Sequence, residues 1–515
     1  MYAKGSIADA TIFYLKCCSA LHAIGVVALT GTGEKMDTFR RRTTAVGIAL
    51  TAVTTLAVLL APTPSSAQQV PAPEASATPA PQPIVVPQRG PNPNNGVFGD
   101  FGGGRTALAR KGVTFFGRYA GEFAGNVTGS PQGTAYASEV QIGANVDFGL
   151  LNGIRNAGIL HFIATQRFGS GLSSTVIGNL GSVQEIFGDG MTTRLTELDY
   201  EQPLGSDAVN VKFGRVIMQN DFAAGSTYWN SNLWCFYQSN AICGTPLGVP
   251  NNSGYGFYPS SEWGVRLKVQ PSSGFYVKAG AYQVNPTYSE RGHGFNLSDT
   301  GDTGVDFPFE TGVTFHDRSG TAIGNLRIGG YYDTSDVLGA ESALSRFVAP
   351  TNPALGAVPQ QMYRGRDGFY VLTDHLIEGS ALPGKPGTAF FLAYEYGDPQ
   401  TAVMSSFADF GLVRHGTFAN RPNDSIALGF AYIDVNARLR TFETALQDAG
   451  FAVPTTNQEK IIELNYGLQL TRSMVLRPGL QYIINPAGEA DVVYPGGAVG
   501  KKNTLVLGLG TNINF

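Results

Sequence analysis

The stretch LVLGLGTNINF, residues 505–515, decides the fold that we predict for this chain. Its apolar side chains fall at alternate positions, on Leu505, Leu507, Leu509, Ile513 and Phe515. The positions between them are small or polar apart from Val506. Because alternate residues of a β-strand face opposite sides of the sheet, one face of this strand is apolar. Such a strand fits a wall between lipid and water, and equally the last strand of a soluble β-sandwich.

The same two-residue rhythm recurs upstream. In VTFFGRYAGEFAGN (113–126), Arg118 and Glu122 alternate with Phe115, Tyr119 and Phe123. Comparable alternation runs through residues 138–148, 158–169, 194–203, 209–215, 263–271, 275–283, 326–333, 462–469 and 476–482. Ile163 is an exception, since it falls on a polar face. A long run of such segments, with charges on the polar face, indicates a barrel in lipid rather than a soluble sandwich.

Composition supports an all-β membrane protein. Only 14% of the 515 residues are charged, against about 25% in an average soluble chain. The 66 glycines suit many tight turns, and a net charge of −4 offers no basic surface for nucleic acid. Beyond the leader, no segment has the roughly 20 apolar residues of a membrane-spanning helix. A chain that spans the membrane with strands must close them into a barrel, because open strand edges are unstable in lipid.

The N-terminal region reads as a leader followed by a linker. Residues 36–67 have the pattern of a secretory signal peptide, with Arg40–Arg42 before an apolar core and Ser65-Ser66-Ala67 at the cleavage site. Residues 1–35 are then an upstream extension, either untranslated or a real N-terminal segment. Residues 68–95 are rich in Pro, Ala and Gln, which predicts a periplasmic linker without a core. The barrel occupies 96–515.

The barrel domain begins with a glycine-rich segment that predicts a short helix. Thr106–Lys111 can form one turn or two, and Gly112 is placed to end it in a left-handed conformation. A phosphate-binding loop is excluded here, because no Lys-Ser/Thr pair follows the glycines and no strand precedes them. Long loops are expected at 285–306 and 340–365. The stretch 113–515 has room for about sixteen antiparallel strands, enough to leave a water-filled lumen.

Few residues point to covalent or metal chemistry. Cys17 and Cys18 lie in the leader, whereas Cys235 and Cys243 predict a disulfide that pins one loop in an oxidising compartment. The six histidines lack metal-ligand spacing, and no Gly-x-Ser-x-Gly motif is present. We therefore expect no metal, no cofactor and no enzymatic activity. A barrel hydrolase with residues assembled across strands stays open, whereas an adhesion barrel would need a larger appended module.

Several separate motifs resemble the carbohydrate-selective porins of the OprB type. They are GDFGGGRTALARKGVTF (99–115), RLTELDYEQ (194–202), FYQSNAICGTP (236–246), NSGYGFYPSSEWGVRLKV (252–269), FYVKAGAYQVNP (275–286), the segment 407–432 and LRPGLQYIINPAG (476–488). They occur in the family's order and span nearly all of the chain after the linker. Two positions depart from the family, Phe101 for its usual Trp and Asp199 for an aromatic residue. The resemblance implies a sixteen-stranded porin that passes sugars across the outer membrane of a Gram-negative bacterium.

The polar faces supply candidates for the pore lining. Sugars are neutral and rich in hydroxyl groups, so a selective lumen should offer charged hydrogen-bond partners and aromatic rings. The candidates are Arg118, Glu122, Arg167, Glu197, Arg266, Lys268 and Arg327. Each could instead be a solvated lumen residue without contact to solute, because the rhythm gives the face of a residue and not its depth. A general porin for ions and small hydrophilic solutes is the alternative function.

The expected partners follow from this reading. They are sugars or other small hydrophilic solutes, outer-membrane lipid, and the barrel-assembly machinery, which would recognise the strand ending at Phe515. A homotrimer is a further expectation from the habit of porins, although no stretch of the sequence marks an interface.

Overall fold

The computed structural model describes residues 96–129, 131–154, 156–188, 190–224, 237–342, 361–380 and 384–515. The predicted extension, signal peptide and linker, residues 1–95, lie outside the described residues, so their boundaries stay predictions.

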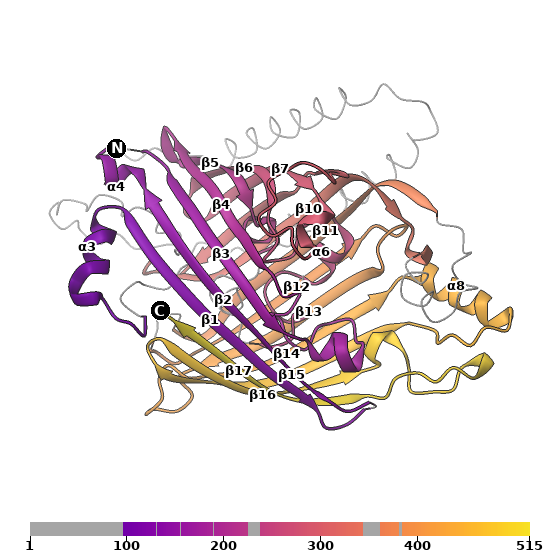
Figure 1. Ribbon diagram of the computed structural model, residues 1–515. Helices are drawn as coiled ribbons and strands as arrows, with labels where there is room; N and C mark the ends of the chain where they lie inside the picture. Colours follow the sequence, from indigo (N-terminus) through magenta and orange to yellow (C-terminus); the bar gives the residue numbers. More distant parts are fainter. Residues whose placement is uncertain are drawn as a thin grey trace, which may run out of the picture. The chain divides into compact units, whose positions relative to one another are not determined.

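Seventeen strands in the described part of the chain form one antiparallel sheet (Figure 1). Their bounds are β1 Val113–Asn126, β2 Thr134–Asp147, β3 Ile159–Gly169, β4 Thr193–Leu204, β5 Ser206–Val216, β6 Glu262–Ser272, β7 Phe275–Val284, β8 Gly304–Asp306, β9 Phe309–His316, β10 Ala322–Leu338, β11 Met362–Gly379, β12 Gly387–Gly397, β13 Met404–His415, β14 Ser425–Val435, β15 Gln458–Thr471, β16 Met474–Ile484 and β17 Thr504–Asn514. Apart from β8 and β9, which do not pair with each other, strands that are neighbours in sequence pair with each other.

The sheet closes on itself, because β1 pairs with both β2 and β17. Phe123 of β1 lies opposite Tyr136 on one side and Leu509 on the other. The short strands β8 and β9 both pair with β7 and β10, so together they fill one position in the wall. Pro308 lies between them and has no N–H to donate to a neighbouring strand. The wall therefore has sixteen positions, which confirms the predicted closed barrel.

The barrel is apolar outside and largely polar inside. On β17, Leu507 and Leu509 are 50% and 41% exposed, whereas Val506, directly before Leu507, is 1% exposed. The outward rows of the other strands follow the same rule, with exposed Phe213, Leu267 and Leu428. The charged residues of the predicted polar faces are turned inward. Because a soluble sandwich would bury its apolar rows, this arrangement confirms the lipid-facing interpretation.

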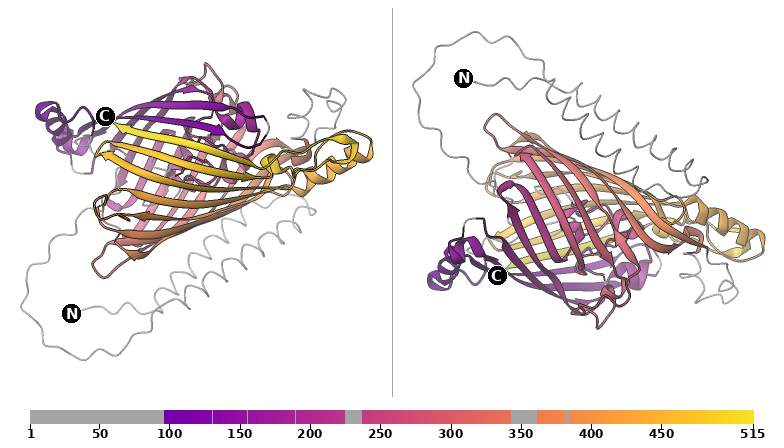
Figure 2. Two further views of the ribbon diagram at one scale, coloured as in Figure 1. Left: turned by 90° about the horizontal axis from the view of Figure 1, so that it is seen from below. Right: turned by 90° about the horizontal axis from the view of Figure 1, so that it is seen from above.

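The two ends of the barrel differ in the length of their connections. At the end that holds Phe515, consecutive strands are joined by residues 148–158, 205, 273–274, 317–321, 380–386, 416–424 and 472–473. At the opposite end, the connections are 127–133, 170–192, 217–261, 285–303, 339–361, 398–403, 436–457 and 485–503. Figure 2 shows α3 and the C terminus at the first end and α8 at the second. Short turns at one end and long loops at the other are typical of outer-membrane barrels.

Five α-helices lie among the described residues: α3 Gly104–Arg110, α4 Phe148–Asn152, α5 Met218–Asp221, α6 Gly248–Asn252 and α8 Ala437–Asp448. The first confirms the predicted N-terminal helix, although it begins two residues earlier and ends one residue earlier than Thr106–Lys111. Gly112 follows with φ of 90°, the left-handed conformation expected of it. The sequence carries no prediction for α8, which begins at Ala437. The preceding Asn436 caps it, and its side chain accepts a hydrogen bond from the Arg438 amide. None of these helices is long and apolar enough to span a membrane.

Candidate functional site

The described residues of two long connections, 170–192 and 217–261, fold back into the barrel. Their apolar residues Leu172, Val183, Tyr237 and Ile242 are buried in one cluster with inward-facing wall residues. Those wall residues are Ala124, Ala135, Ala389, Phe391, Met404, Phe407, Val413, Ala427, Ala431, Ile433, Ile461, Ile483 and Val506. Figure 1 shows α6 within the ring of strands, and α6 contacts β11, β12 and β13. The inward face is thus not polar all round, which corrects the simple picture of wet side chains along the whole lumen.

The apolar part of the inward face can be recognised in the sequence of the wall strands. In β12, GTAFFLAYEYG, apolar residues occupy both faces, with Phe390 and Leu392 outward and Phe391 and Ala393 inward. An inward apolar row would be unstable against water and needs a cover. The two inserted connections provide that cover, because their own apolar residues pack on it.

Two carboxylates of β15 hold the inserted connections through their backbone. The Glu463 side chain accepts hydrogen bonds from the amides of Gln238 (2.7 Å) and Ser239 (2.9 Å). The Glu459 side chain accepts hydrogen bonds from the amides of Leu180 and Gly181, both at 2.8 Å. Both carboxylates are essentially inaccessible to water. Each glutamate fixes one connection against the wall, because its side-chain oxygens are the acceptors for two buried backbone amides. We call Glu459 and Glu463 the carboxylate clasps.

A second set of contacts holds α5 against β5, β6 and β7. Asp221 at the end of α5 lies 3.3 Å from Lys212 and 3.4 Å from Arg266, measured between charged atoms. Lys278 donates a hydrogen bond to the Asp221 carbonyl and is also paired with Glu310 at 2.7 Å. Glu310 in turn accepts a hydrogen bond from the Ala223 amide at 2.9 Å. Residues 217–224 are therefore fixed from four strands, β5, β6, β7 and β9.

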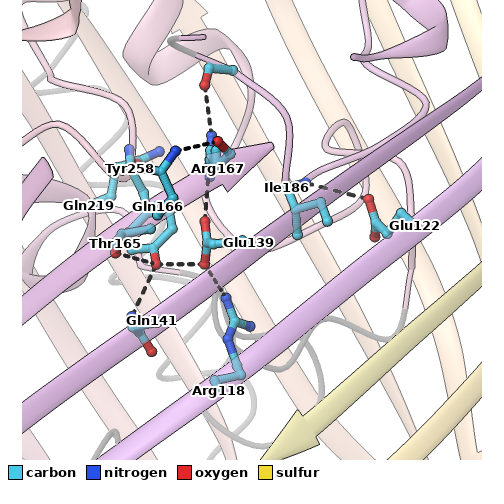
Figure 3. Close-up of polar contacts among 11 residues, drawn as sticks. Arg118, Glu122, Glu139, Gln141, Thr165, Gln166, Arg167, Ile186, Gln219 and Tyr258 are labelled. Carbon is cyan, nitrogen blue, oxygen red and sulfur yellow. Dashed lines mark hydrogen bonds and ion pairs between the residues drawn. The ribbon is translucent and has the colours of Figure 1, made fainter. Parts of the chain in front are cut away.

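A third group joins β1, β2 and β3 through side chains alone. Glu139 lies between two guanidinium groups, 2.7 Å from Arg118 and 2.8 Å from Arg167, as Figure 3 shows. The Tyr258 hydroxyl, from the connection 217–261, donates to Glu139 at 2.8 Å and accepts from Gln141 at 3.0 Å. Arg167 also lies over the Tyr258 ring, 5.3 Å from its centroid. We call Arg118, Glu139, Arg167 and Tyr258 the arginine cluster.

Loop residues near the arginine cluster have perturbed protonation. Burial raises the pKa of the Glu185 carboxyl to about 7, despite the opposing effect of nearby Arg118. Burial, and then the charge of Glu139, raises the pKa of the Tyr258 hydroxyl, so that it stays protonated as a donor. Glu185 thus carries a partial charge at neutral pH, at the point where the connection 170–192 faces the cluster.

The structure places all seven predicted lining residues on the inward face and divides them among these groups. Arg118 and Arg167 meet in the arginine cluster. The backbone amide of Ile186 lies 3.5 Å from the Glu122 carboxylate. Glu197 approaches Lys212 at 3.8 Å, Arg266 pairs with Glu201 at 2.9 Å, Arg327 donates to the Ala224 carbonyl at 2.6 Å, and Lys268 lies over the Tyr276 ring at 5.4 Å.

Sequence reasoning missed several residues of these groups. Strict alternation puts Arg194 on the outward face with Leu198, but the pairing with β3 slips by one residue at Thr196. This β-bulge turns Arg194 inward, where it is 1% exposed and donates to the Ser289 carbonyl. Tyr258 and Asp221 come from a long connection without periodicity, so no local signal marks them. Glu139, Glu459 and Glu463 lie on a predicted polar face or beside one. In the sequence they look like any other residue of such a face, and only their partners in the structure show their roles.

The predictions on the disulfide and on metal ligands concern the described residues only in part. Cys235 lies outside the described residues, so its bridge to the buried Cys243 stays a prediction. Across the described ranges, no three His, Cys, Asp or Glu side chains are arranged to hold a metal ion.

A closed barrel with an apolar exterior, a polar interior and inserted loops defines the class of outer-membrane porins. The chain belongs to the carbohydrate-selective porin, OprB family, whose profile matches residues 131–515. It is 30% identical over 438 residues to Porin B of Pseudomonas aeruginosa, covering 80% of this chain and 90% of that protein. It also resembles the high-pH structure of Pseudomonas putida OprB, with TM-score 0.72, 29% identity, and coverage of 82% of this chain and 99% of that one.

The family and the fold confirm the resemblance drawn from the motifs and place the protein in the outer membrane of a Gram-negative bacterium. They indicate a channel rather than an enzyme.

Proposed function

We propose that this porin lets sugars diffuse passively across the outer membrane, through the part of the lumen that the connections 170–192 and 217–261 leave open. The observation that carries the proposal is the inward polar face of β1–β7, which the two inserted connections contact at Ile186, Asp221 and Tyr258. Sugars need hydrogen-bond partners of both kinds along their path, and this face offers guanidinium, ammonium, carboxylate and phenol groups within one surface. A porin must also release its solute, so many moderate contacts serve better than one tight site.

The residues that we propose as solute contacts are Arg118, Glu122, Arg167, Glu197, Arg266, Lys268 and Arg327. Their geometry supports this role in different degrees. Lys268 is half-buried on the inward face and lies over the ring of the half-buried Tyr276, which pairs a donor with an aromatic face. The other six are largely buried by their own ion pairs and loop contacts. They act mainly by fixing the shape and charge of the passage, and they present only their edges to a solute.

The test is sugar block of single-channel current in planar bilayers. A sugar that occupies the passage excludes ions, so glucose or maltose should reduce the current in a concentration-dependent way. The reduction should weaken in the Lys268→Ala variant, whereas Lys460→Ala on the outward face of β15 is the matched control. An unchanged current at high sugar concentration would instead favour a general porin for ions and small hydrophilic solutes.

We further propose how the chain is processed and assembled, on the basis of its leader and its last strand. Residues 36–67 direct secretion and are removed, residues 68–95 form a periplasmic linker, and the strand ending at Phe515 is recognised by the barrel-assembly machinery. A Cys235–Cys243 disulfide would add a covalent restraint to the connection 217–261. Mass spectrometry of the purified protein, with and without reductant, tests the mature N terminus and the disulfide together.

A further inference from the structure

An apolar patch surrounds the start of the barrel, at the end with short connections. Its members are the exposed residues Phe98, Phe101, Leu108, Leu150, Leu151 and Ile154. Phe98 and Phe101 are 62% and 68% exposed, which is unusual for side chains of this size. We call these six residues the rim patch. Contiguous exposed apolar surface on a folded protein marks an interaction site.

The patch belongs to two segments that are held rigidly against each other and against the wall. The Arg105 guanidinium donates to the backbone oxygens of Phe115 (2.9 Å) and Phe515 (3.2 Å). Phe98 packs on the Phe515 ring, with 5.6 Å between centroids. The second segment, α4, touches the first at Gly112, where an added Cβ would lie 3.0 Å from the Leu150 side chain. The rim patch is thus a built surface and not a loose tail.

The patch continues the outward apolar face of the barrel. Phe115, the outward residue at the start of β1, is 53% exposed and directly follows the α3 segment. On the neighbouring strands, Phe148 of α4 packs on Tyr200, and Tyr200 packs on Phe213. These rings form an outward aromatic row at the same end, as expected where a barrel wall meets the membrane–water interface. The two segments that carry the rim patch, α3 and α4, lie at this same end of the strands (Figure 1), beside the aromatic row.

The charge beside the patch favours an anionic partner. The described segment 96–112 carries Arg105, Arg110 and Lys111. Its acidic residue, Asp100, accepts hydrogen bonds from the Thr106 amide and hydroxyl, both at 2.8 Å. Arg110 and Lys111 are exposed next to Leu108. Apolar side chains flanked by exposed basic groups are typical of surfaces that lie in the headgroup region of a membrane.

We propose that the rim patch docks onto the periplasmic leaflet of the outer membrane, with its apolar side chains among the acyl chains and with Arg110 and Lys111 on anionic phospholipid headgroups. The patch fastens the mouth of the barrel to the leaflet at the point where the linker 68–95 joins it. The alternatives are contact with a second copy of the chain and simple exposure to the periplasm.

The test places a tryptophan in the patch and measures its contact with lipid. The variants Phe101→Trp and Leu150→Trp are reconstituted in vesicles containing brominated phospholipid, and the emission of the wild-type protein is subtracted. Bromine near the headgroup end of the acyl chains should quench both new tryptophans. The matched control is Val493→Trp at the opposite end, where the native side chain is 73% exposed; it should resist bromine and respond to aqueous iodide.

The outcomes separate the three occupants. Quenching by iodide without a response to brominated lipid at positions 101 and 150 overturns the proposal in favour of solvent. Protection from both quenchers, lost together with a trimer in cross-linking, overturns it in favour of a second copy. In the background of Arg110→Glu and Lys111→Glu, bromine quenching should fall in phosphatidylglycerol vesicles and stay unchanged in zwitterionic ones. Equal quenching in both would overturn the assignment of an anionic headgroup.

Discussion

The inward faces of β1–β7 and of β12–β16 use charged residues in different ways. On the first face, Arg118, Glu139 and Arg167 satisfy one another across neighbouring strands. On the second face, Glu459 and Glu463 have no cation within ion-pair distance among the described residues and accept backbone amides of the inserted connections instead. A carboxylate with a charged partner shapes the field of the lumen, whereas a carboxylate bound to amides holds a loop. An inward carboxylate in a porin can thus either line the passage or hold the loops that shape it.

The apolar surroundings explain the division. The clasps lie in the half of the barrel where inward residues such as Phe391, Ile433 and Ile461 are also apolar. A lone carboxylate in such surroundings would be strongly destabilised, so its hydrogen bonds to the loop amides stabilise both partners. On β1–β3, charged side chains of adjacent strands face one another, so Glu139 forms its ion pairs within the wall. On β5 and β6, Lys212 and Arg266 pair with Asp221 of the inserted connection.

The largest expected effect comes from breaking a clasp. In Glu463→Ala, the amides of Gln238 and Ser239 lose their acceptor in a buried site, at a cost of about 1–3 kcal/mol for each group. The connection 217–261 should loosen, so that single-channel conductance rises and limited proteolysis cuts this connection first. Glu459→Ala should do the same for the connection 170–192.

The variant Glu463→Gln sharpens this test. Glutamine keeps one acceptor oxygen at nearly the same volume and removes the charge. If the clasp acts by holding the loop, conductance should fall between that of wild type and that of Glu463→Ala. If Glu463→Gln and Glu463→Ala have the same conductance and the same loss of cation selectivity, Glu463 acts through its charge. The proposed difference between the two inward faces would then be wrong.

A smaller effect on conductance, but a larger one on ion selectivity, is expected in the arginine cluster. In Glu139→Gln, Arg118 and Arg167 lose the negative partner that they share, which for a buried pair costs about 3–5 kcal/mol. The lumen gains net positive charge, so the reversal potential in a salt gradient should shift toward anion selectivity. Glu378→Gln, an exposed carboxylate at the short-connection end, is the control. An unchanged reversal potential in Glu139→Gln would show that the arginine cluster does not influence the ions that pass through the lumen.

The pH dependence of the channel's ion selectivity should reflect the protonation of Glu185. Its pKa is raised to about 7, so between its ordinary pKa and about pH 7 the folded connection keeps a proton that the unfolded chain releases. This contribution favours the inserted connection at acidic pH and is lost as the pH rises through 7. The charged groups that act on Glu185 are Arg118, Arg167, Arg477, Glu122 and Glu139.

The measurement compares ion selectivity at pH 5 and pH 8. Ionised Glu185 adds a negative charge to the lumen, so the wild-type channel should be more cation-selective at pH 8. Glu185→Gln should flatten this difference while leaving conductance at pH 5 unchanged. A full pH response in the variant would assign the titration to another carboxylate.

The smallest expected effect is that of Tyr258→Phe. The ring and its contact with Arg167 stay, and the hydrogen bond from its hydroxyl to Glu139 is lost, which is worth about 1.5–3 kcal/mol because the acceptor is charged. Conductance should hardly change, whereas sugar block should weaken slightly if the hydroxyl contacts solute. Tyr432→Phe, on the outward face of β14, is a matched control. Equal sugar block in wild type and Tyr258→Phe would leave the tyrosine a purely structural role.

Much of the architecture could be predicted because it depends on local alternation. The outward rows of β1, β6, β7 and β17 were assigned residue by residue, and the structure places them as expected. The number of strands followed from chain length, and the contrast between long and short connections from glycine-rich stretches. The failures also have local causes: the bulge at Thr196 reversed the face of Arg194, and strands such as β12, with apolar residues on both faces, carry no alternation at all.

The sequence by itself determined which side chains turn toward lipid and which turn inward, because a strand alternates its faces and a membrane tolerates no open edge. Only the tertiary structure decided what the inward carboxylates do. Glu139 and Glu463 look alike along the chain, and they differ because one meets two guanidinium groups from neighbouring strands and the other meets loop amides more than two hundred residues away in sequence. The fate of a buried charge depends on the partners that folding brings to it, and sequence spacing carries no record of them.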